Sequence, residues 1–244
     1  MKLRDRVALV TGASRGIGRA VAKLFATQGA HVLLLARTIG ALEEVDDEIQ
    51  QAGGTATLVP LDLLDLAGID RLAQPILERF RRLDILVANA GMLGRLTPLQ
   101  QFPPDLWEKT FTLNVHANWR LIRALDPLLR ASPSGRAIFV TSGITRHLPA
   151  YWGAYAASKA ALEAMVATYA AETRKSNLRV NLVNPGPTRT RMRAEAFPGE
   201  DPESLPPPER VAEAFLPLAD AGCRLHGEWV AVDEWLAGRS ARRH

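Results

Sequence analysis

A tyrosine and a lysine lie four residues apart at the start of a predicted helix. Tyr155 and Lys159 belong to the segment Ala154–Arg174, whose apolar spacing is helical. Residues four apart share one helical face, so we expect the Lys159 ammonium near the Tyr155 phenol. A free tyrosine has a pKa of about 10, and a positive charge at about 4 Å lowers it by roughly three units, less the opposing effect of burial. The pair is therefore predicted to exchange a proton near neutral pH.

Two other polar residues are predicted to join this pair. Ser142 follows the strand-like run Ala137–Thr141, and ligands of open α/β sheets bind at the carboxyl ends of strands. Its hydroxyl could hydrogen-bond a substrate oxygen and stabilise charge developing there. Asn114 lies within the predicted helix Asp105–Leu129, where an amide competes with helical geometry. It is interpreted either as an exposed helical asparagine or as an amide that orders a water beside Lys159.

A glycine-rich turn separates the first predicted strand, Val7–Thr11, from the first predicted helix, Arg15–Gln28. Gly12 is predicted to permit the tight turn, Gly16 the approach of a pyrophosphate, and Gly18 the close packing of the helix on the sheet. The amino end of the helix would offer free N–H groups to the phosphates. The alternative is a plain turn without a ligand. The position favours a dinucleotide site that contains Gly12, Ser14, Arg15, Gly16, Ile17 and Gly18.

The residue that follows the second predicted strand indicates which dinucleotide binds. NAD sites often carry an acid there for the ribose 2′-hydroxyl, whereas this strand ends in Leu35-Ala36-Arg37. Arg37 and Arg15 could hold a 2′-phosphate by charge-assisted hydrogen bonds. The alternative is that both are ordinary surface arginines. We therefore predict NADP(H) as the cofactor.

Short apolar runs alternate with helical stretches along the chain. The runs are continuous, which is typical of strands buried on both faces of a parallel sheet. This order predicts an α/β Rossmann fold, in which right-handed βαβ units form a doubly wound sheet with helices on both faces. The predicted strands are Val7–Thr11, His31–Ala36, Ala56–Pro60, Ile85–Ala88, Ala137–Thr141 and Val180–Asn184.

We expect a single domain over residues 1–244, because no linker divides the chain before about residue 187. The proline-rich segment Pro187–Pro208 is predicted to be an irregular loop beside the site rather than a linker, since too little chain follows it for a second domain.

Composition narrows the class of protein. Hydrophobic residues make up 47% and charged residues 23% of 244 residues, as in ordinary globular proteins. Cys223 is the single cysteine, so no intrachain disulfide can form. We find no secretory signal and no apolar run long enough to span a membrane. The basic residues behind the net charge of +4 are scattered along the chain. They indicate either a solvated basic surface or attraction to anionic partners such as a phosphorylated cofactor or carrier. We expect a cytoplasmic protein with no membrane or nucleic-acid partner.

The motifs named above, together with Asn89-Ala90-Gly91 and Asn184-Pro185-Gly186, resemble the short-chain dehydrogenase/reductase family. The resemblance covers about residues 5–190, with a weaker trace at His226–Val232. The TGxxxGxG pattern of the family matches Thr11–Gly18. Its Asn–Ser–Tyr–Lys tetrad falls, in order and spacing, on Asn114, Ser142, Tyr155 and Lys159. The segment Arg189–Pro208 resembles a poorly characterised bacterial branch.

The resemblance implies an enzyme that transfers a hydride between NADP(H) and a carbonyl or secondary alcohol, with Tyr155 as acid and base. It implies a homodimer or homotetramer, with Asp105–Leu129 and Ala154–Arg174 at the interface. It also implies cofactor contacts from Asp62, Leu63, Asn89, Ala90, Gly91, Tyr155, Lys159, Pro185, Gly186, Thr188 and Thr190.

The substrate is less defined by the sequence. Apolar candidates to line its site are Leu93, Leu148, Tyr151, Trp152, Met192 and Phe197. Arginines that could receive an acidic group or a carrier phosphate are Arg95, Arg146, Arg189, Arg191 and Arg193. A 3-oxoacyl type of ketone is weakly favoured over a sugar, a steroid-like or a quinone-like substrate. The alternatives to an oxidoreductase are a regulatory protein that senses NADP(H) without turnover and an epimerase or dehydratase that uses the cofactor transiently.

Overall fold

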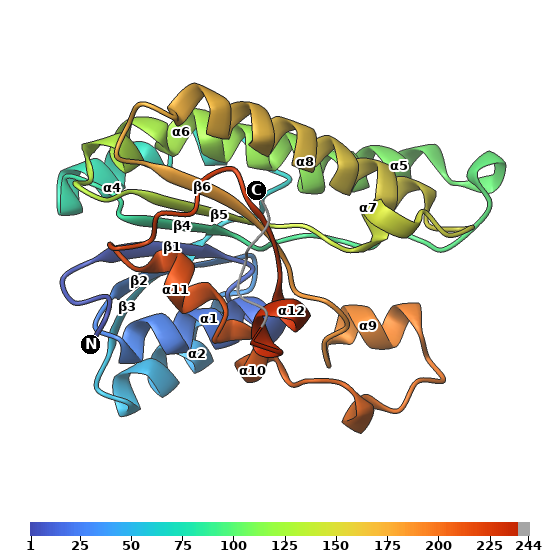
Figure 1. Cartoon of the computed structure of the whole chain (residues 1–244), viewed down its shortest axis with the longest axis horizontal. Helices are drawn as coiled ribbons and strands as arrows, with labels where there is room; N and C mark the ends of the chain where they lie inside the picture. The colour runs from blue at the N-terminus through green and yellow to red at the C-terminus, as the bar shows by residue number, and fades with distance from the viewer. Residues whose placement is uncertain (239–244) are drawn as a thin grey trace.

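A seven-stranded parallel sheet forms the centre of the molecule, in a computed structural model that describes residues 1–238 (Figure 1). Its strand order is β3-β2-β1-β4-β5-β6-β7. The strands are β1 (Val7–Thr11), β2 (His31–Ala36), β3 (Thr55–Pro60), β4 (Ile85–Ala88), β5 (Arg136–Val140), β6 (Arg179–Asn184) and β7 (Trp229–Ala231). The first six lie within one residue of their predicted bounds, and the α/β prediction is confirmed.

Burial explains most of the apolar runs. Every residue of β1, β4 and β5 is buried, as expected for strands covered on both faces. β3 differs from that expectation, because it forms the edge of the sheet and its end residues Thr55 and Pro60 are exposed. A proline is tolerated there, since an edge strand needs fewer backbone donors.

Helices cover both faces of the sheet (Figure 1). On one face, a core containing Phe25 and Phe215 packs under one group of helices. On the other face, Leu121 and Leu162 lie in a second core. The first group is α1 (Gly16–Thr27), α2 (Ile39–Gln51), α10 (Pro208–Ala212), α11 (Phe215–Ala219) and α12 (Val232–Leu236); the second is α3 (Leu66–Asp70), α4 (Ala73–Phe80), α6 (Ala117–Ala131) and α8 (Gly153–Thr173).

Two predicted segments differ in detail. The helix expected over Asp105–Leu129 is divided into α5 (Pro104–Phe111) and α6 by a π-helical turn at Thr112–His116. Single π turns inside helices often occur at functional sites. The segment Pro187–Pro208 is more ordered than a plain loop, because it contains the short helix α9 (Arg191–Ala196) and a 3-10 turn at Pro202–Ser204.

Because the strands are parallel, their carboxyl ends all lie on the same side of the molecule, here called the carboxyl edge of the sheet. From β1 the chain adds β2 and β3 on one side, and it then returns to add β4 on the other side of β1. Doubly wound sheets bind ligands at this point, where the strand order reverses. The short helices α7 (Ile144–His147) and α9 extend beyond the carboxyl edge (Figure 1). In the part of the chain that the structure describes, no helix has the length and apolar character to cross a membrane.

Candidate active site

Tyr155 and Lys159 are both buried on the first turns of α8, with 8% and 3% of their surface exposed. The Lys159 Nζ atom lies 5.8 Å from the centre of the Tyr155 ring. The same nitrogen donates a hydrogen bond of 2.8 Å to the carbonyl oxygen of Val140, the last residue of β5. Lys159 thereby fixes the start of α8 against the end of β5, and the prediction that the two side chains are neighbours is confirmed.

The predicted pKa of Tyr155 is wrong for the protein alone. Burial raises the pKa of the phenol to about 12, and a side-chain hydrogen bond from Ser142 lowers it by less. Burial also lowers the pKa of the Lys159 ammonium to about 8, although the Glu163 carboxylate opposes this effect. Sequence spacing suggested a lowering by the Lys159 charge, whereas burial is the largest effect on this phenol. The phenol is therefore protonated at neutral pH and is suited to donate a proton.

Ser142 lies beside Tyr155, where its hydroxyl lowers the pKa of the phenol and so opposes part of the effect of burial. Ser142 lies directly after β5 and Thr141, at the carboxyl edge of the sheet. Asn184, at the end of β6, holds the next residue by accepting a hydrogen bond of 2.9 Å from the Gly143 N–H. This role of Asn184 was not predicted, although the residue stands in the quoted Asn184-Pro185-Gly186 motif.

Asn114 lies in the π-helical turn and is fully buried, so its interpretation as an exposed helical residue is wrong. Its Oδ1 atom accepts from the Met92 N–H at 2.9 Å, and its Nδ2 atom donates to the Met92 carbonyl at 3.0 Å and to the Ser158 hydroxyl at 2.9 Å. A Cβ atom on Gly91 would lie 3.3 Å from Asn114 Oδ1 and 3.5 Å from Lys159 Nζ. Asn114 therefore joins the segment after β4 to α8 beside Lys159.

The glycine turn has the geometry that its sequence predicts. Gly12 and Gly16 have φ angles of 66° and 55°, in the left-handed region that favours glycine. A Cβ atom on Gly18 would lie 2.2 Å from the Gly12 carbonyl oxygen, which is too close for any other residue. Ser14 is half-buried and Ile17 packs against the core under α1. The turn thus brings the amino end of α1 close to the carboxyl end of β1.

Thr11 and Asn89 join the ends of β1 and β4 where the sheet changes direction. The Thr11 hydroxyl accepts hydrogen bonds of 3.0 Å from the N–H groups of both Asn89 and Ala90. The Asn89 Nδ2 atom donates to the Thr11 carbonyl at 2.9 Å. The structural role of Thr11 was not predicted. The side-chain amide of Asn89 is used in the hydrogen bond that joins the two strand ends.

The two arginines expected to bind a 2′-phosphate are both exposed. Arg37 lies at the end of β2, with its guanidinium 4.0 Å from the Asp62 carboxylate. Asp62 also accepts a hydrogen bond of 3.0 Å from the Leu64 N–H. Leu63 is buried in the core, so only its backbone is available to a ligand.

The residues after β6 form a tight turn next to Ser142. Gly186 has a φ angle of 68°, and its N–H donates at 3.2 Å to Asn184 Oδ1 after Pro185. The buried Thr188 hydroxyl lies 3.2 Å from the Gly186 carbonyl oxygen. Thr190 caps α9 by accepting a hydrogen bond of 3.3 Å from the Arg193 N–H.

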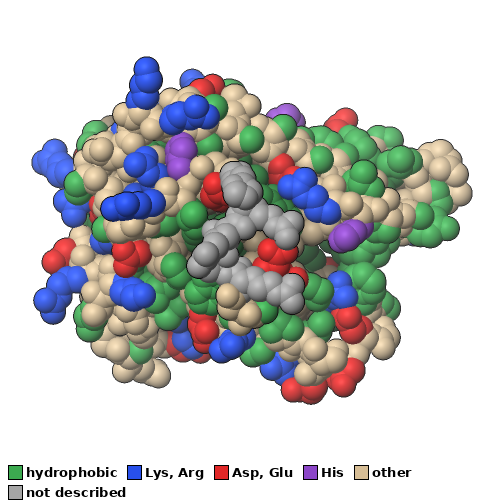
Figure 2. All heavy atoms as spheres, viewed as in Figure 1, with side chains coloured by type: hydrophobic (Ala, Val, Ile, Leu, Met, Phe, Trp, Pro, Cys, Tyr) green, Lys and Arg blue, Asp and Glu red, His purple; other side chains and the backbone are tan. Residues whose placement is uncertain are grey.

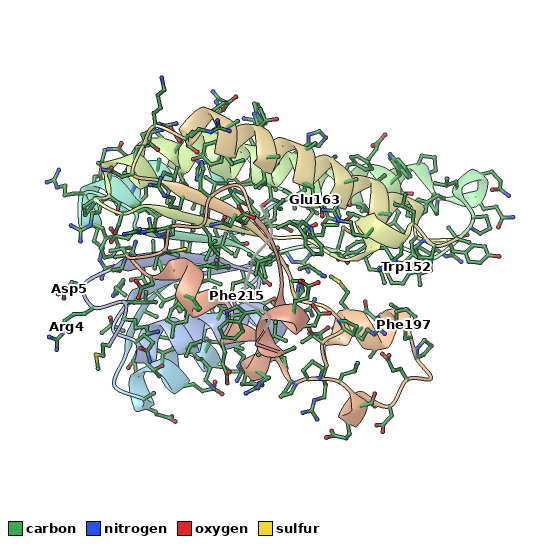
Figure 3. The ribbon with its side chains drawn as sticks, viewed as in Figure 1. Arg4, Asp5, Trp152, Glu163, Phe197 and Phe215 are labelled. Carbon is green, nitrogen blue, oxygen red and sulfur yellow. The ribbon has the colours of Figure 1, made fainter. Side chains whose placement is uncertain are left out.

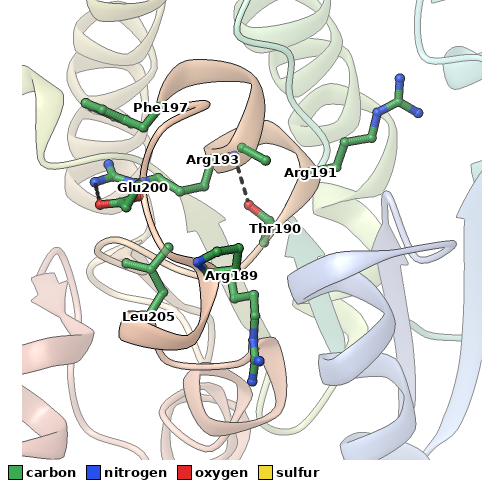
Figure 4. Close-up of a pocket in the computed structure, with 9 residues that line it drawn as sticks. Arg189, Thr190, Arg191, Arg193, Phe197, Glu200 and Leu205 are labelled. Carbon is green, nitrogen blue, oxygen red and sulfur yellow. Dashed lines mark hydrogen bonds and ion pairs between the residues drawn. The ribbon is translucent and has the colours of Figure 1, made fainter.

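Three arginines of the segment Pro187–Pro208 are paired with glutamates of the same region. Arg193 donates two hydrogen bonds of 2.6 Å to Glu200, and Arg191 pairs with Glu195 at 2.9 Å. Arg189 pairs with Glu203. A cavity of about 280 Å³ lies inside this segment (Figure 4). Its lining residues are Arg189, Thr190, Arg191, Arg193, Ala194, Phe197, Glu200, Pro202 and Leu205.

Aromatic side chains connect this segment to the catalytic residues. The Trp152 ring lies 6.1 Å from the ring of Tyr155 and 5.7 Å from that of Phe197 on the other side. Figure 3 labels Trp152, which directly precedes α8, and Phe197, which directly follows α9, on the same end of the molecule. Leu148 and Tyr151 are 65% and 58% exposed nearby in the chain. Hydrophobic side chains also gather at the end of the molecule that holds α5, α7 and α9, on the right in Figure 2. Of the predicted apolar lining, Leu93 is buried instead.

Known proteins match the chain over most of its length. The family model for short chain dehydrogenases matches residues 6–201. The chain belongs to the short chain dehydrogenase family. The uncharacterized oxidoreductase YciK of Escherichia coli (strain K12) is 43% identical over 244 residues, which cover 99% of this chain and 89% of the relative.

Two other proteins similar to this short chain dehydrogenase carry more specific names. The crystal structure of a short chain dehydrogenase from Escherichia coli CFT073, complexed with NADPH, has a TM-score of 0.91 and 42% identity over 95% of this chain and 98% of that chain. A 3-oxoacyl-[acyl-carrier-protein] reductase of rhamnolipid biosynthesis from Pseudomonas aeruginosa is 34% identical over 95% of this chain and 96% of the relative. These comparisons agree with the motifs that suggested the family.

Proposed function

We propose that this chain is an oxidoreductase that transfers a hydride between NADP(H) and a carbonyl or secondary alcohol. One observation carries the proposal: the buried Tyr155 phenol, which is protonated at neutral pH, lies beside Lys159 and close enough to the Ser142 hydroxyl for that group to affect its pKa. This group stands at the carboxyl edge of the sheet, where the glycine turn begins. A proton donor next to a dinucleotide turn fits carbonyl reduction.

The residues around the glycine turn fit a dinucleotide. Gly12 and Gly16 adopt positive φ angles, and a Cβ atom on Gly16 would meet no heavy atom closer than 3.5 Å. The backbone of the turn is therefore open to a pyrophosphate, which the amino end of α1 would stabilise. When bound, the nicotinamide supplies or accepts the hydride. The exposed Arg15 and Arg37 are placed to pair with the 2′-phosphate of NADP(H).

Each catalytic residue then has a distinct task. Tyr155 donates the proton to the substrate oxygen, because burial keeps its hydroxyl protonated. Ser142 hydrogen-bonds the same oxygen and stabilises the negative charge that develops on it. Lys159 supplies a positive charge beside the phenol, and the buried Asn114 holds the segment after β4 against α8.

We propose a neutral ketone with an apolar substituent as substrate, of which the 3-oxoacyl type is one case. The exposed Leu148, Tyr151 and Phe197 offer apolar surface near Trp152 and Tyr155. Arg189, Arg191 and Arg193 are paired with glutamates, which weakens their predicted role as receptors for an acidic group. The 3-oxoacyl reductase among the relatives supports this class.

Oxidation of NADPH with a panel of ketones tests the proposal. We expect turnover with apolar ketones and a loss of about 100-fold or more in kcat for Tyr155→Phe, the size of a lost general acid. NADPH binding, followed by its fluorescence, should change little in this variant. Tight NADPH binding without turnover on any ketone would support the sensor alternative, and substrate conversion without net NADPH loss would support an epimerase or dehydratase.

A further inference from the structure

We propose that Glu163 is a positioning residue of the catalytic site, which fixes the Ser142 segment to the face of α8 that carries Tyr155 and Lys159. The inference rests on the proposed function. Glu163 lies two helical turns after Tyr155 and one turn after Lys159, so the three side chains share one face of α8. Figure 3 labels Glu163 on α8, between this helix and the sheet in that view.

One carboxylate oxygen of Glu163 accepts hydrogen bonds from both sides of Ser142. Its Oε1 atom lies 2.7 Å from the Thr141 hydroxyl and 2.9 Å from the Thr145 hydroxyl. The glutamate side chain is 14% exposed. Hydrogen bonds to a charged acceptor are stronger than neutral ones. The segment that presents the Ser142 hydroxyl is therefore held, before and after Ser142, by the helix that presents Tyr155.

The same oxygen also contacts the last strand of the sheet. The Trp229 indole N–H donates to Glu163 Oε1 at 2.8 Å, from β7. The second oxygen lies 3.8 Å from the Arg146 guanidinium, which also stacks 4.9 Å above the Trp229 ring. Glu163 therefore joins α8, the end of β5, α7 and β7 through one charged group. A glutamate with these partners is more than a solvated helix residue.

The charge of Glu163 acts on the buried ammonium of Lys159. Burial lowers the pKa of Lys159 to about 8, and the Glu163 carboxylate raises it against that effect. The charged groups that act on Glu163 are Lys159 on its own helix and Arg146 on α7. Its other contacts are uncharged: the Thr141 hydroxyl directly after β5, the Thr145 hydroxyl and the Trp229 indole of β7. Without Glu163, Lys159 would lose its proton closer to neutral pH.

Two substitutions separate the two roles. Glu163→Gln keeps an acceptor oxygen and removes the charge, whereas Glu163→Asp keeps the charge and withdraws it from Thr141 and Thr145 by one methylene. Glu172→Gln is the matched control, because it removes an exposed carboxylate from the same helix. The readouts are the pH profile of kcat with NADPH and a ketone, and an NMR titration of 13C-labelled lysine in the protein without ligands. The signal among the five lysines is assigned with Lys159→Met.

For Glu163→Gln we expect the midpoint of the Lys159 titration to fall by about one pH unit, as for the loss of one opposite charge nearby. The pH at which kcat declines on the alkaline side of its profile, called the alkaline limb, should fall by the same amount. At pH 8 the protonated fraction of Lys159 then falls from about half to about a tenth, so kcat falls about 5-fold. For Glu163→Asp we expect a lower kcat with the limb near its original pH. Glu172→Gln should match the unmodified protein in both readouts.

The inference would be overturned if Glu163→Gln and Glu172→Gln had the same midpoint for the Lys159 titration and the same kcat. Circular dichroism and thermal unfolding establish that each variant is folded before it is compared. If the unmodified protein reduces no ketone, the proposed function fails, but the NMR titration still decides whether Glu163 controls the charge of Lys159. The two failures are therefore distinguishable.

Discussion

The packing of α1 on the glycine turn can be tested by adding one methyl group at Gly18. In Gly18→Ala the new Cβ atom would lie 2.2 Å from the Gly12 carbonyl oxygen and 2.5 Å from Asn89 Nδ2. The nearest neighbour is backbone and cannot rotate away. The start of α1 must move by about 1 Å to restore an ordinary contact. This movement also pulls on the hydrogen bond of 2.9 Å between Asn89 and the Thr11 carbonyl.

The cost follows from these two effects. Overpacking costs about 1–3 kcal/mol, and a weakened internal hydrogen bond adds about 1 kcal/mol. We expect the free energy of unfolding to fall by about 2–4 kcal/mol, which for a chain of this size corresponds to a drop in Tm of about 4–16 °C. Because the shift displaces the backbone proposed to hold the pyrophosphate, NADPH affinity should fall about 10-fold or more.

Differential scanning calorimetry and NADPH fluorescence titration measure both effects. Gly199→Ala is the matched control, since a Cβ atom there has no neighbour within 4 Å and the residue lies in an exposed turn. We expect that control to unfold within about 2 °C of the unmodified protein, as surface substitutions usually do. If Gly18→Ala unfolded and bound NADPH like Gly199→Ala, the close approach between α1 and the turn would not exist and the argument would fail.

Four other expectations follow from the site. Arg37→Ala should weaken NADPH much more than NADH in fluorescence titrations, and equal losses would exclude a 2′-phosphate contact. Asn114→Leu should lower the free energy of unfolding by about 2–4 kcal/mol in urea titrations, because it leaves both polar groups of Met92 without their buried partner. Arg193→Met should speed proteolysis within Pro187–Pro208, since it removes the two hydrogen bonds to Glu200; unchanged cleavage would show that the pair does not order the segment. Size-exclusion chromatography with light scattering should give a dimer or tetramer, as the family resemblance implies, and a monomer would refute it.

Local sequence determined the fold and the identity of the central site residues. The runs Val7–Thr11 and Ile85–Ala88 are long enough only for strands, and their continuous apolar character fits a sheet covered on both sides. Gly12 was recognisable because its turn demands a positive φ. The spacing of Tyr155 and Lys159 places both on one helical face whatever the tertiary structure. Such features depend on residues close together in the chain.

Tertiary structure decided the electrostatics of the site. The direction of the Tyr155 pKa shift follows from burial, and burial depends on elements far along the chain. Spacing alone predicted a pKa lowered by the Lys159 charge, and this was wrong for the protein alone, because burial of the phenol raises its pKa. Asn114 likewise became a buried link only because its helix passes through a π turn against Met92.

The same reason explains why Glu163 was not found from the sequence. Its partners Thr141, Thr145 and Trp229 come from 18 to 66 residues away in the chain, and no local pattern relates them. Arg193 in turn was expected to be available to a ligand until its contact with Glu200 appeared. The sequence by itself determined which residues stand at the ends of the strands, because strand-forming apolar runs and helical periodicity are local properties. Only the folded chain decided which of those residues are charged, paired or free to act, because those states depend on desolvation and on long-range neighbours.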